Sequence, residues 1–377
     1  MKEDRQRVLF VIPSLAGGGA ERVAVQVLNA LDRGRWDRSL FLHERVGPFL
    51  VDVSSDITLE SADVSSRIGQ WHALRRFIRR TRPHVVVAFL SYWSALTAAR
   101  AAGVGAKVVF AIGTPVGAFL SDRDYRWSQP WNRRVFIAVM RTACALADRI
   151  IATSTGVADD LIASVGGTAA RIRVVHNPVD VMEVVSAARE PIDSADEARW
   201  QRPVIVAAGR LAEAKNYPLL IDAFAILRRR MPGTLFILGT GDEETKLRSL
   251  IASHGLADSV HLCGFRRNPW SYMARADVFA LTSHYEGFGN VLVEAMACGV
   301  PVVATRSAGT LEVITSGADG LVVDQHEPEA FARALATIIE DGALRAQMTA
   351  AAREHAKRYR TDTIAGDYDR VLTEALA

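Results

Sequence analysis

Cysteine is scarce in this chain, and its few cysteines stand far apart. Cys144, Cys263 and Cys298 are the three cysteines among 377 residues, and none has another within CxxC or metal-ligand spacing. This pattern excludes a disulfide-stabilised scaffold and a cysteine-ligated metal site. We interpret the three thiols as small buried apolar groups in a reducing compartment.

Long hydrophobic runs are absent as well. The longest stretch without a charged side chain covers residues 83–99, between Arg82 and Arg100. It is shorter than the roughly 20 residues that a membrane-spanning helix needs, and we interpret it as a buried strand followed by a helix. The first seven residues mix acids with bases, and the apolar run after them ends at Gly17. We therefore expect no signal peptide and a cytoplasmic protein.

The chain lacks a strong excess of either charge, with 45 Lys and Arg against 42 Asp and Glu, a net of +3. Its halves nevertheless differ. Residues 1–190 hold 25 basic and 18 acidic residues, a net of +7, whereas residues 191–377 hold 20 and 24, a net of −4. No nucleic-acid-binding motif accompanies the basic half, so we do not expect nucleic acid as a partner.

Basic residues concentrate at residues 75–82 and again at residues 123–141. In the second stretch bases alternate with aromatic and apolar residues: Arg126, Arg133, Arg134 and Arg141 with Trp127, Trp131, Phe136 and Ile137. This alternation favours a peripheral contact with an anionic membrane surface. The alternative is an ordinary solvated helix whose aromatic residues belong to the core.

Short apolar runs alternate with segments of helical pattern along the whole chain. The runs lie at residues 8–12, 39–42, 85–89, 107–110, 149–153 and 172–175, and the pattern restarts at 203–208, 235–238, 260–262, 278–281 and 300–304. Continuous apolar runs are typical of parallel sheets covered by helices on both faces. Because a chain of this length is too long for one core, we predict an α/β protein with a domain at 1–185, a linker at 186–202 and a domain at 203–359.

One segment carries the strongest chemical signal. Glu286 and Glu294 stand eight positions apart, with a Gly-Phe-Gly turn directly after the first and a helical pattern over residues 290–298. A glycine turn that leads into a helix offers backbone amides and the helix dipole to an anion. An anionic group with hydroxyls on either side, as in a sugar nucleotide, would suit such a site. The alternative is a solvated helix with two surface acids.

With its glycine turn and the apolar strand behind it, this segment resembles the Glu-x7-Glu signature of the group-4 family of retaining GT-B glycosyltransferases. The resemblance extends over essentially the whole chain. It implies two Rossmann-like, doubly wound parallel-sheet domains that face each other across a cleft. A C-terminal helix at about residues 360–377 would pack back on the first domain.

The resemblance also assigns roles to the residues of this segment. Glu286 would contact the hydroxyls of the donor sugar, as a catalytic residue, and Glu294 would contact those of the ribose. The residues between them would line the same donor site: Gly287, Phe288, Gly289, Asn290 and Val291.

A second segment directly follows an apolar strand and reads Gly-Arg-Leu-Ala-Glu-Ala-Lys-Asn from Gly209. In the family that it resembles, this segment supplies an Arg and a Lys that clamp the donor diphosphate, and Arg210 and Lys215 match them. Fixed cations there would stabilise the charge that develops on the leaving nucleoside diphosphate. We therefore expect that no metal is required, and the alternative is a pair of surface bases.

Further glycine loops match the family's donor site. Gly18 and Gly19 belong to a turn that lacks the third glycine of GxGxxG, so their backbone alone would approach the ligand; the alternative is a plain tight turn. Gly239 matches a second glycine loop. A third loop, with Gly264, Phe265 and Arg266, would pass near the nucleobase.

One feature of the family is missing. Many relatives carry a histidine at the end of a strand near the middle of the first domain, but no histidine lies between His84 and His176 here. The departing phosphate can accept the proton of the acceptor, so the difference concerns the acceptor side rather than activity itself. His176, in an Asn-Pro-x-Asp turn, is expected to be structural.

The sequence thus predicts a metal-independent, retaining glycosyltransferase without a cofactor. It would move a hexose or N-acetylhexosamine from a nucleotide diphosphate sugar, UDP rather than GDP, to a saccharide or polyprenyl-linked acceptor. The enzyme would be cytoplasmic, with a peripheral contact to the inner face of the membrane. Two alternatives are a nucleotide-sugar epimerase of the same fold and a non-catalytic nucleotide- or glycan-binding relative. The four charged residues argue against the second: Arg210, Lys215, Glu286 and Glu294.

Overall fold

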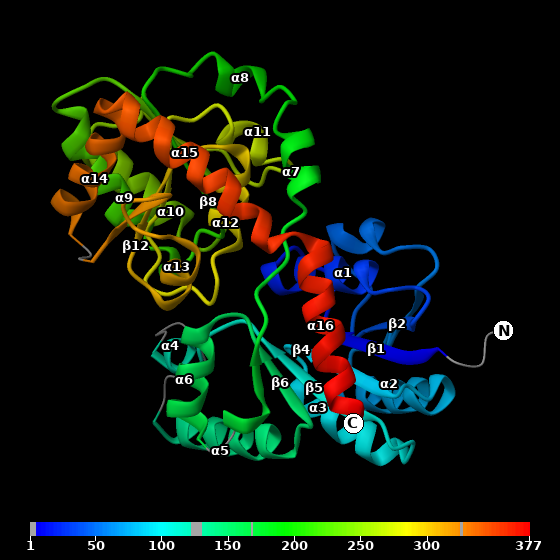
Figure 1. Ribbon diagram of the computed structural model, residues 1–377. Helices are drawn as coiled ribbons and strands as arrows, with labels where there is room; N and C mark the ends of the chain where they lie inside the picture. Colours follow the sequence, from blue (N-terminus) through cyan, green and yellow to red (C-terminus); the bar gives the residue numbers. More distant parts are fainter. Residues whose placement is uncertain (1–4, 122–129, 167–168, 325–326) are drawn as a thin grey trace. The chain divides into compact units, whose positions relative to one another are not determined.

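The computed structural model of the chain describes residues 5–121, 130–166, 169–324 and 327–377. These residues divide into two compact units, one made of residues 1–178 and 361–377 and the other of residues 179–360. Each unit is an α/β layer structure with its own sheet (Figure 1). In both sheets all strand pairs are parallel.

The first unit contains a seven-stranded sheet with the order β3-β2-β1-β4-β5-β6-β7. Its strands are β1 (Gln6–Ile12), β2 (Trp36–Leu42), β3 (Thr58–Ser61), β4 (Val85–Phe89), β5 (Lys107–Ile112), β6 (Arg149–Ala152) and β7 (Ile172–Val174). Its helices are α1 (Gly19–Ala30), α2 (Arg67–Thr81), α3 (Tyr92–Ala102), α4 (Val116–Ser121), α5 (Pro130–Leu146), α6 (Thr155–Val165) and α16 (Thr361–Leu376).

The strand β1 shows why both faces of this sheet are covered. Alternate side chains of a strand point to opposite faces, so Leu9 and Val11 join a core with α2 and α3, while Val8 and Phe10 join a core with α1. All four side chains are at most 1% exposed. A strand buried on both faces needs a continuous apolar run, which is how its position could be predicted from the sequence.

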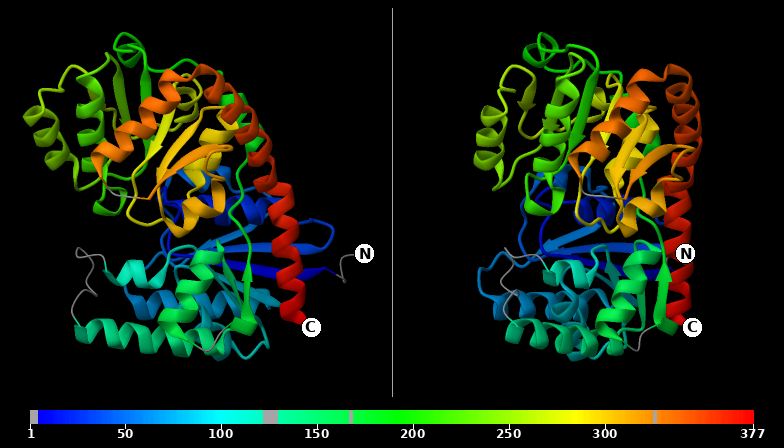
Figure 2. Two further views of the ribbon diagram at one scale, coloured as in Figure 1. Left: turned by 60° about the vertical axis from the view of Figure 1, so that its left-hand side comes forward. Right: turned by 90° about the vertical axis from the view of Figure 1, so that its left-hand side faces the viewer.

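The C-terminal helix α16 belongs to the first unit, although the chain reaches it only after the second. Ile364, Tyr368, Val371 and Leu372 form an apolar stripe at helical spacing and enter the same core as α1. Asp369 fixes the other flank, because it accepts hydrogen bonds from Arg35 at 2.6 Å and from the Trp36 indole at 2.5 Å. Two views show α16 (red) beside the strands of its unit (Figure 2).

The second unit has a six-stranded sheet with the order β10-β9-β8-β11-β12-β13. Its strands are β8 (Val204–Ala208), β9 (Thr234–Leu238), β10 (Val260–Leu262), β11 (Val278–Leu281), β12 (Val302–Thr305) and β13 (Gly320–Val323). Its helices are α7 (Val181–Ala187), α8 (Ser194–Glu197), α9 (Tyr217–Arg228), α10 (Glu244–Ser253), α11 (Trp270–Met273), α12 (Asn290–Cys298), α13 (Ala308–Val313), α14 (Pro328–Glu340) and α15 (Gly342–Ala356).

The boundary between the units differs from the predicted one. The chain enters the second unit at Val179 rather than after residue 185, because α7 packs against α11 and α12 of that unit. The segment 186–202, which we expected to be a linker, contains α8 and belongs to the second unit as well. Ile192 and Asp196 of this segment are buried there. The linker prediction was therefore wrong, because a polar composition does not by itself indicate an unpacked segment.

Candidate functional site

The candidate site lies at the carboxyl edge of the second sheet. The strand β8 sits in the middle of this sheet, between β9 on one side and β11 on the other. From β8 the strands β9 and β10 follow on one side and β11, β12 and β13 on the other, so the strand order reverses at this point. In open parallel sheets, ligands bind in the crevice that such a reversal leaves at the carboxyl ends of the strands. The loops that follow β8 and β11 carry the two predicted charged segments, one with Arg210 and Lys215 and the other with Glu286.

Glycines allow the loops at this edge to touch through their backbones. Gly239 has φ 144°, and its N–H donates to the Gly264 carbonyl oxygen at 2.8 Å. A β-carbon on Gly239 would lie 1.9 Å from the Gly209 carbonyl oxygen, so no side chain fits there. Gly209 itself has φ 154° and donates to the Leu238 oxygen at 2.9 Å. Three predicted glycines therefore join the loops after β8, β9 and β10 into one surface.

The two predicted cations have different environments. Lys215 ends a short 3-10 turn (Glu213–Lys215), and its ammonium donates to Oε1 of Glu286 at 2.5 Å. The Arg210 side chain is exposed, and none of the described residues forms a hydrogen bond or an ion pair with its guanidinium. Lys215 is thus committed to a carboxylate, while Arg210 is available to an anion from solution.

Glu286 is held by donors on two loops. Besides Lys215, the hydroxyl of Ser283 donates to its Oε1 at 2.6 Å, and the side chain is only 12% exposed. The hydroxyl of Thr282 donates to the backbone oxygen of Lys215 at 3.0 Å, which ties the loop after β11 to the loop after β8. The structure therefore brings together Lys215 and Glu286, which are 71 residues apart in sequence.

Tyr217 is a neighbour of this ion pair that the sequence reasoning missed. The residue is 4% exposed, and no described residue forms a hydrogen bond with its hydroxyl. Burial, and secondarily the negative charge of Glu286, raises the pKa of Tyr217 well above its usual value. A β-carbon on Gly209 would lie 3.1 Å from this hydroxyl, so the tyrosine lies directly under the loop with Arg210. In the sequence, its position directly after Lys215 and Asn216 was the feature that could have indicated a place near the site.

Glu294 lies deeper in the unit than Glu286. The helix α12 that carries it starts after Gly289, whose φ is 88°, and Glu294 itself is 8% exposed. The indole N–H of Trp270 donates to its Oε2 at 2.9 Å. Because one carboxylate oxygen has a fixed donor, the side chain keeps one orientation. Gly287 is buried, and Asn290 and Val291 are half-buried in the first turn of the helix.

Two expected binding side chains have other roles in this structure. Phe288 is 2% exposed and packs edge-on against Tyr359 with ring centroids 5.1 Å apart, so its side chain belongs to the core. Arg266 donates to Asp196 at 2.9 Å and to the Tyr272 hydroxyl at 3.1 Å, which anchors the loop rather than leaving the guanidinium free.

The neighbours of Arg266 remain accessible. Phe265 is 58% exposed, and Gly264 adopts φ 70° at the turn. An exposed aromatic ring on an anchored loop offers a flat apolar surface for a ring system of a ligand. Among the three residues expected near a nucleobase, the geometry thus favours Phe265.

Gly18 and Gly19 belong to the first unit, at the carboxyl end of β1. Gly18 precedes α1 as its N-cap, and Gly19 is the first residue of the helix. A β-carbon on Gly18 would meet the carboxylate of Glu21 at 2.2 Å, which is the movable end of a side chain. No rigid neighbour among the described residues therefore requires glycine at position 18.

The sequence contains two Asp-x-Asp patterns, a motif that can hold a divalent cation. One, at residues 122–124, lies outside the described residues. In the other, Asp367 pairs with Arg370, and Asp369 is bound to Arg35 and Trp36 as described above. Among the described residues, no group of three or more His, Cys, Asp or Glu side chains is arranged to hold a metal.

Comparisons with known proteins extend over nearly the whole chain. Residues 189–355 match the family described as Glycosyl transferases group 1, and residues 17–183 match Glycosyltransferase Family 4. The lipopolysaccharide core biosynthesis glycosyltransferase LpsE of Rhizobium meliloti is 34% identical over 230 residues, 60% of this chain and 62% of that protein.

A second relative is a Campylobacter jejuni enzyme, N-acetylgalactosamine-N,N'-diacetylbacillosaminyl-diphospho-undecaprenol 4-alpha-N-acetylgalactosaminyltransferase. It is 34% identical over 222 residues, 59% of each chain. This chain therefore matches about three fifths of the length of these curated relatives.

Solved structures confirm the predicted fold class. Anabaena HepE, solved in complex with UDP and glucose, superposes with a TM-score of 0.80 at 24% identity, covering 98% of this chain and 100% of HepE. WaaG, a glycosyltransferase involved in lipopolysaccharide biosynthesis, gives a TM-score of 0.75 at 17% identity, covering 97% of this chain and 99% of WaaG. At these identities the likeness concerns the fold alone.

The close backbone contact of the glycine loops gives a stability prediction. Gly239→Ala should destabilise the protein strongly, because its β-carbon would overlap the Gly209 oxygen. Gly255→Ala is the matched control: Gly255 has φ 67° but nothing within 4 Å of an added β-carbon, so only the left-handed backbone costs about 1–2 kcal/mol. Urea unfolding should show a clearly larger loss for Gly239→Ala. Equal losses would mean that the loops separate easily.

Proposed function

Because the chain belongs to the group-1 glycosyltransferases of the family-4 type, we propose that it transfers a sugar from a nucleotide diphosphate donor to a saccharide or lipid-linked acceptor. The observation that carries this proposal is the cluster at the carboxyl edge of the second sheet. There an unpaired Arg210 lies on the loop that also carries Lys215, which is bound to Glu286.

Each charged group has a role that its position supports. Arg210, with no partner among the described residues, would bind the donor diphosphate together with Lys215. Glu286 would accept hydrogen bonds from the donor sugar, and Glu294, oriented by Trp270, from the ribose. The exposed ring of Phe265 would stack on the base. UDP is the nucleotide that we favour, and HepE, which has this fold, was solved with UDP and with UDP-glucose.

The proposed reaction retains configuration at the anomeric carbon. The acceptor oxygen bonds to that carbon as the bond to the diphosphate oxygen breaks, and the electron pair of the broken bond stays on the diphosphate. The acceptor proton moves to a phosphate oxygen, so the step needs no histidine base in the first unit. Cations already fixed near the leaving group stabilise its growing charge more in the transition state than in the ground state. No metal is assigned a part in this scheme.

The transferase proposal is better supported than its two alternatives. An epimerase would need acid and base side chains at the sugar, and of the groups at this edge Glu286 is already paired with Lys215. A non-catalytic binder would not need Lys215, Ser283 and Glu286 held together by contacts of 2.5 and 2.6 Å. Both relatives described above are named as transferases.

A panel of nucleotide sugars tests the proposal directly. The full chain is incubated with UDP- and GDP-sugars, with and without saccharide and polyprenyl-linked acceptors. Release of nucleoside diphosphate together with a glycosylated acceptor supports transfer. An epimerised donor would instead support the epimerase, and binding without turnover on every acceptor would support the non-catalytic relative.

The first prediction from the proposed function concerns the two cations. Arg210→Ala or Lys215→Ala should lower turnover at saturating donor by roughly two orders of magnitude, as for other groups that stabilise transition-state charge. Arg248→Ala is the matched control, since Arg248 is an exposed base of the same unit that pairs with Glu244 along α10. Near-normal turnover in either variant, with the control unchanged, would refute the assignment.

The second prediction separates the two carboxylates. Glu294→Gln should weaken binding of free UDP, because Glu294 is assigned to the ribose. Trp270→Phe should weaken it as well, since the indole fixes Oε2 of Glu294. Glu286→Gln should leave UDP binding nearly intact and depress transfer. Calorimetric titration with UDP and a transfer assay measure both effects, and an equal loss of UDP affinity in the two glutamate variants would contradict the division.

The third prediction concerns the membrane. None of the described helices is long and apolar enough to span a bilayer. Arg126 and Trp127 lie outside the described residues, and nothing is described of the side chain of Trp131. Phe136 and Ile137 pack against the core, so these two residues are not the inserting groups that the sequence suggested.

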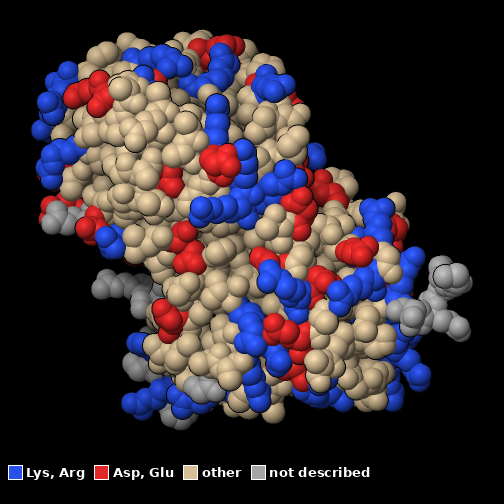
Figure 3. Space-filling model, in the orientation of Figure 1, with Lys and Arg blue, Asp and Glu red and all other residues tan. Residues whose placement is uncertain are grey.

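What α5 does expose is a pair of bases beside apolar residues. Arg133 and Arg134 are exposed, as are Val135 and Val139 at 42% and 40%. On the face drawn in Figure 3, basic side chains gather over the region of α5. We therefore propose a peripheral contact with anionic headgroups on the cytoplasmic side, to which each base contributes about 1 kcal/mol.

Vesicle co-sedimentation measures this contact. The double variant Arg133→Gln, Arg134→Gln should bind anionic vesicles several-fold more weakly, and added salt should release the native protein. The matched control is Arg229→Gln, Arg230→Gln, an adjacent exposed pair in the second unit. Equal binding to neutral and anionic vesicles would remove the membrane from the proposal.

A further inference from the structure

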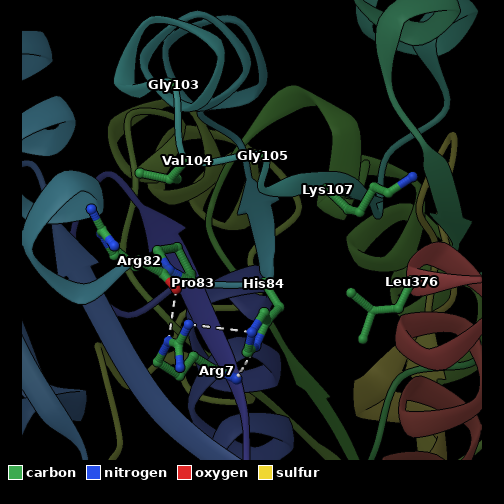
Figure 4. A pocket seen from close by; sticks show the side chains of 9 residues that line it. All are labelled: Arg7, Arg82, Pro83, His84, Gly103, Val104, Gly105, Lys107 and Leu376. Carbon is green, nitrogen blue, oxygen red and sulfur yellow. Dashed lines mark hydrogen bonds between the residues drawn. The ribbon is translucent and has the colours of Figure 1, made fainter.

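A cavity of about 550 Å³ lies in the first unit, at the opposite edge of its sheet from the glycine turn. Figure 4 shows the residues around it. It opens at the amino ends of three neighbouring strands, β1, β4 and β5. Its volume is within the range of roughly 300–1,000 Å³ typical of small-molecule sites. The residues that line it are Arg7, Arg82, Pro83, His84, Gly103, Val104, Gly105, Lys107 and Leu376.

Three of the lining residues are cations, and none is an acid. The guanidinium of Arg82 is exposed and forms no hydrogen bond or ion pair with any described residue. Lys107 is 3.7 Å from a carboxylate oxygen of Asp148, but that carboxylate also pairs with Arg100 at 3.3 Å. The described part of the cavity wall therefore carries positive charge that is not neutralised.

Arg7 and His84 add a contact between donors. The backbone N–H of Arg7 faces Nδ1 of His84 at 2.9 Å, and its guanidinium Nη2 faces Nε2 at 3.2 Å. Burial, and secondarily the charge of Arg7, lowers the pKa of His84, so the ring is neutral near pH 7. A neutral imidazole has one acceptor nitrogen and one N–H. One of the two contacts thus places donor against donor, whichever tautomer the ring adopts.

The frame of this contact is rigid. The Nε of Arg7 donates to the backbone oxygen of Arg82 at 2.7 Å, and the backbone N–H of His84 donates to the backbone oxygen of Arg7 at 2.8 Å. The opposite wall is open, since β-carbons on Gly103 and Gly105 would find nothing within 4 Å. An acceptor in the cavity would accept the hydrogen that lacks a partner without moving the strands.

We propose that this cavity binds a small molecule through a phosphate or diphosphate group. The anion would accept from Arg7 or His84 at the cavity floor and pair with Arg82 and Lys107 at its rim. These two long side chains extend to opposite sides in Figure 4 and would turn inward to reach it. Guanidinium and ammonium donors suit phosphate oxygens through charge-assisted hydrogen bonds. This site lies wholly in the first unit and does not depend on the donor site assigned above.

Calorimetric titration of the full chain with inorganic pyrophosphate tests the site. Pyrophosphate would also bind the proposed donor site, so the titration is carried out in an Arg210→Ala, Lys215→Ala background. One site should remain. Adding Arg82→Asn or Lys107→Gln should weaken it by roughly tenfold each, as expected for the loss of one charged hydrogen bond. Asparagine suits position 82 because Arg82 has φ 45°.

Arg67→Gln is the matched control, because Arg67 is an exposed base at the start of α2 that does not line the cavity. It should leave pyrophosphate binding unchanged. The proposal is overturned if no site remains in the double-variant background, or if the control weakens binding as much as Arg82→Asn does. It is also overturned if Arg82→Asn lowers binding to phosphatidylglycerol vesicles while free pyrophosphate does not bind, since the anion would then be a lipid headgroup.

Discussion

The absence of a side chain at Gly239 is the constraint on which the candidate site depends. The loop after β9 touches the loop after β8 so closely that a β-carbon would lie 1.9 Å from the Gly209 oxygen. Through Gly239 the contact continues to Gly264 on the loop after β10. Arg210 is therefore carried by a loop that packs on two others. Contacts between the backbones of glycines, rather than between side chains, hold this loop in place.

The ion pair between Lys215 and Glu286 neutralises charge that a ligand would otherwise meet. Both side chains are largely shielded, at 24% and 12% exposed, so the pair is partly removed from water and holds its two loops in register. A diphosphate that approached Lys215 would have to share it with Glu286, whereas Arg210 is free to attract the anion first. Arg210 is thus more available to an anion than Lys215. The ion pair also neutralises the Glu286 carboxylate, which would otherwise be an isolated, largely buried charge.

Local sequence patterns were sufficient for the α/β class and for the glycine turns of the site, whereas the two Rossmann-like domains were implied by the family resemblance. Continuous apolar runs predicted eleven of the thirteen described strands, but β3 and β13, which are not buried along their whole length, were missed. Gly209, Gly239 and Gly289 marked turns that do adopt positive φ. Such signals work because they depend on one residue or a few neighbours. The proximity of Lys215 and Glu286 could also be predicted, since both residues follow adjacent strands of a parallel sheet. The distance between the two side chains could not.

What the sequence could not reveal depended on distant partners. Arg266 was expected to face a ligand but is bound by Asp196, 70 residues earlier, in a segment that we had interpreted as a linker. Phe288 was expected at the site but packs on Tyr359. A phenylalanine in a glycine turn looks the same in sequence whether its ring is buried or exposed. The unit boundary at Val179 likewise follows from packing of α7 on α12, which no local pattern encodes.

The two edges of the first sheet illustrate a more general point about parallel sheets. Carboxyl edges carry the loops that usually bind ligands, while amino edges usually carry connections alone. Here the amino edge holds Arg7, His84 and Lys107 on three adjacent strands, with one contact that leaves a donor without an acceptor. An anion in this cavity would give that donor an acceptor and would meet cations that no carboxylate fully neutralises, through charge-assisted hydrogen bonds. An incoming anion is attracted to Arg210 before Lys215 because Arg210 has no carboxylate partner among the described residues, and for the same reason this edge is a second place where an anion would be stabilised.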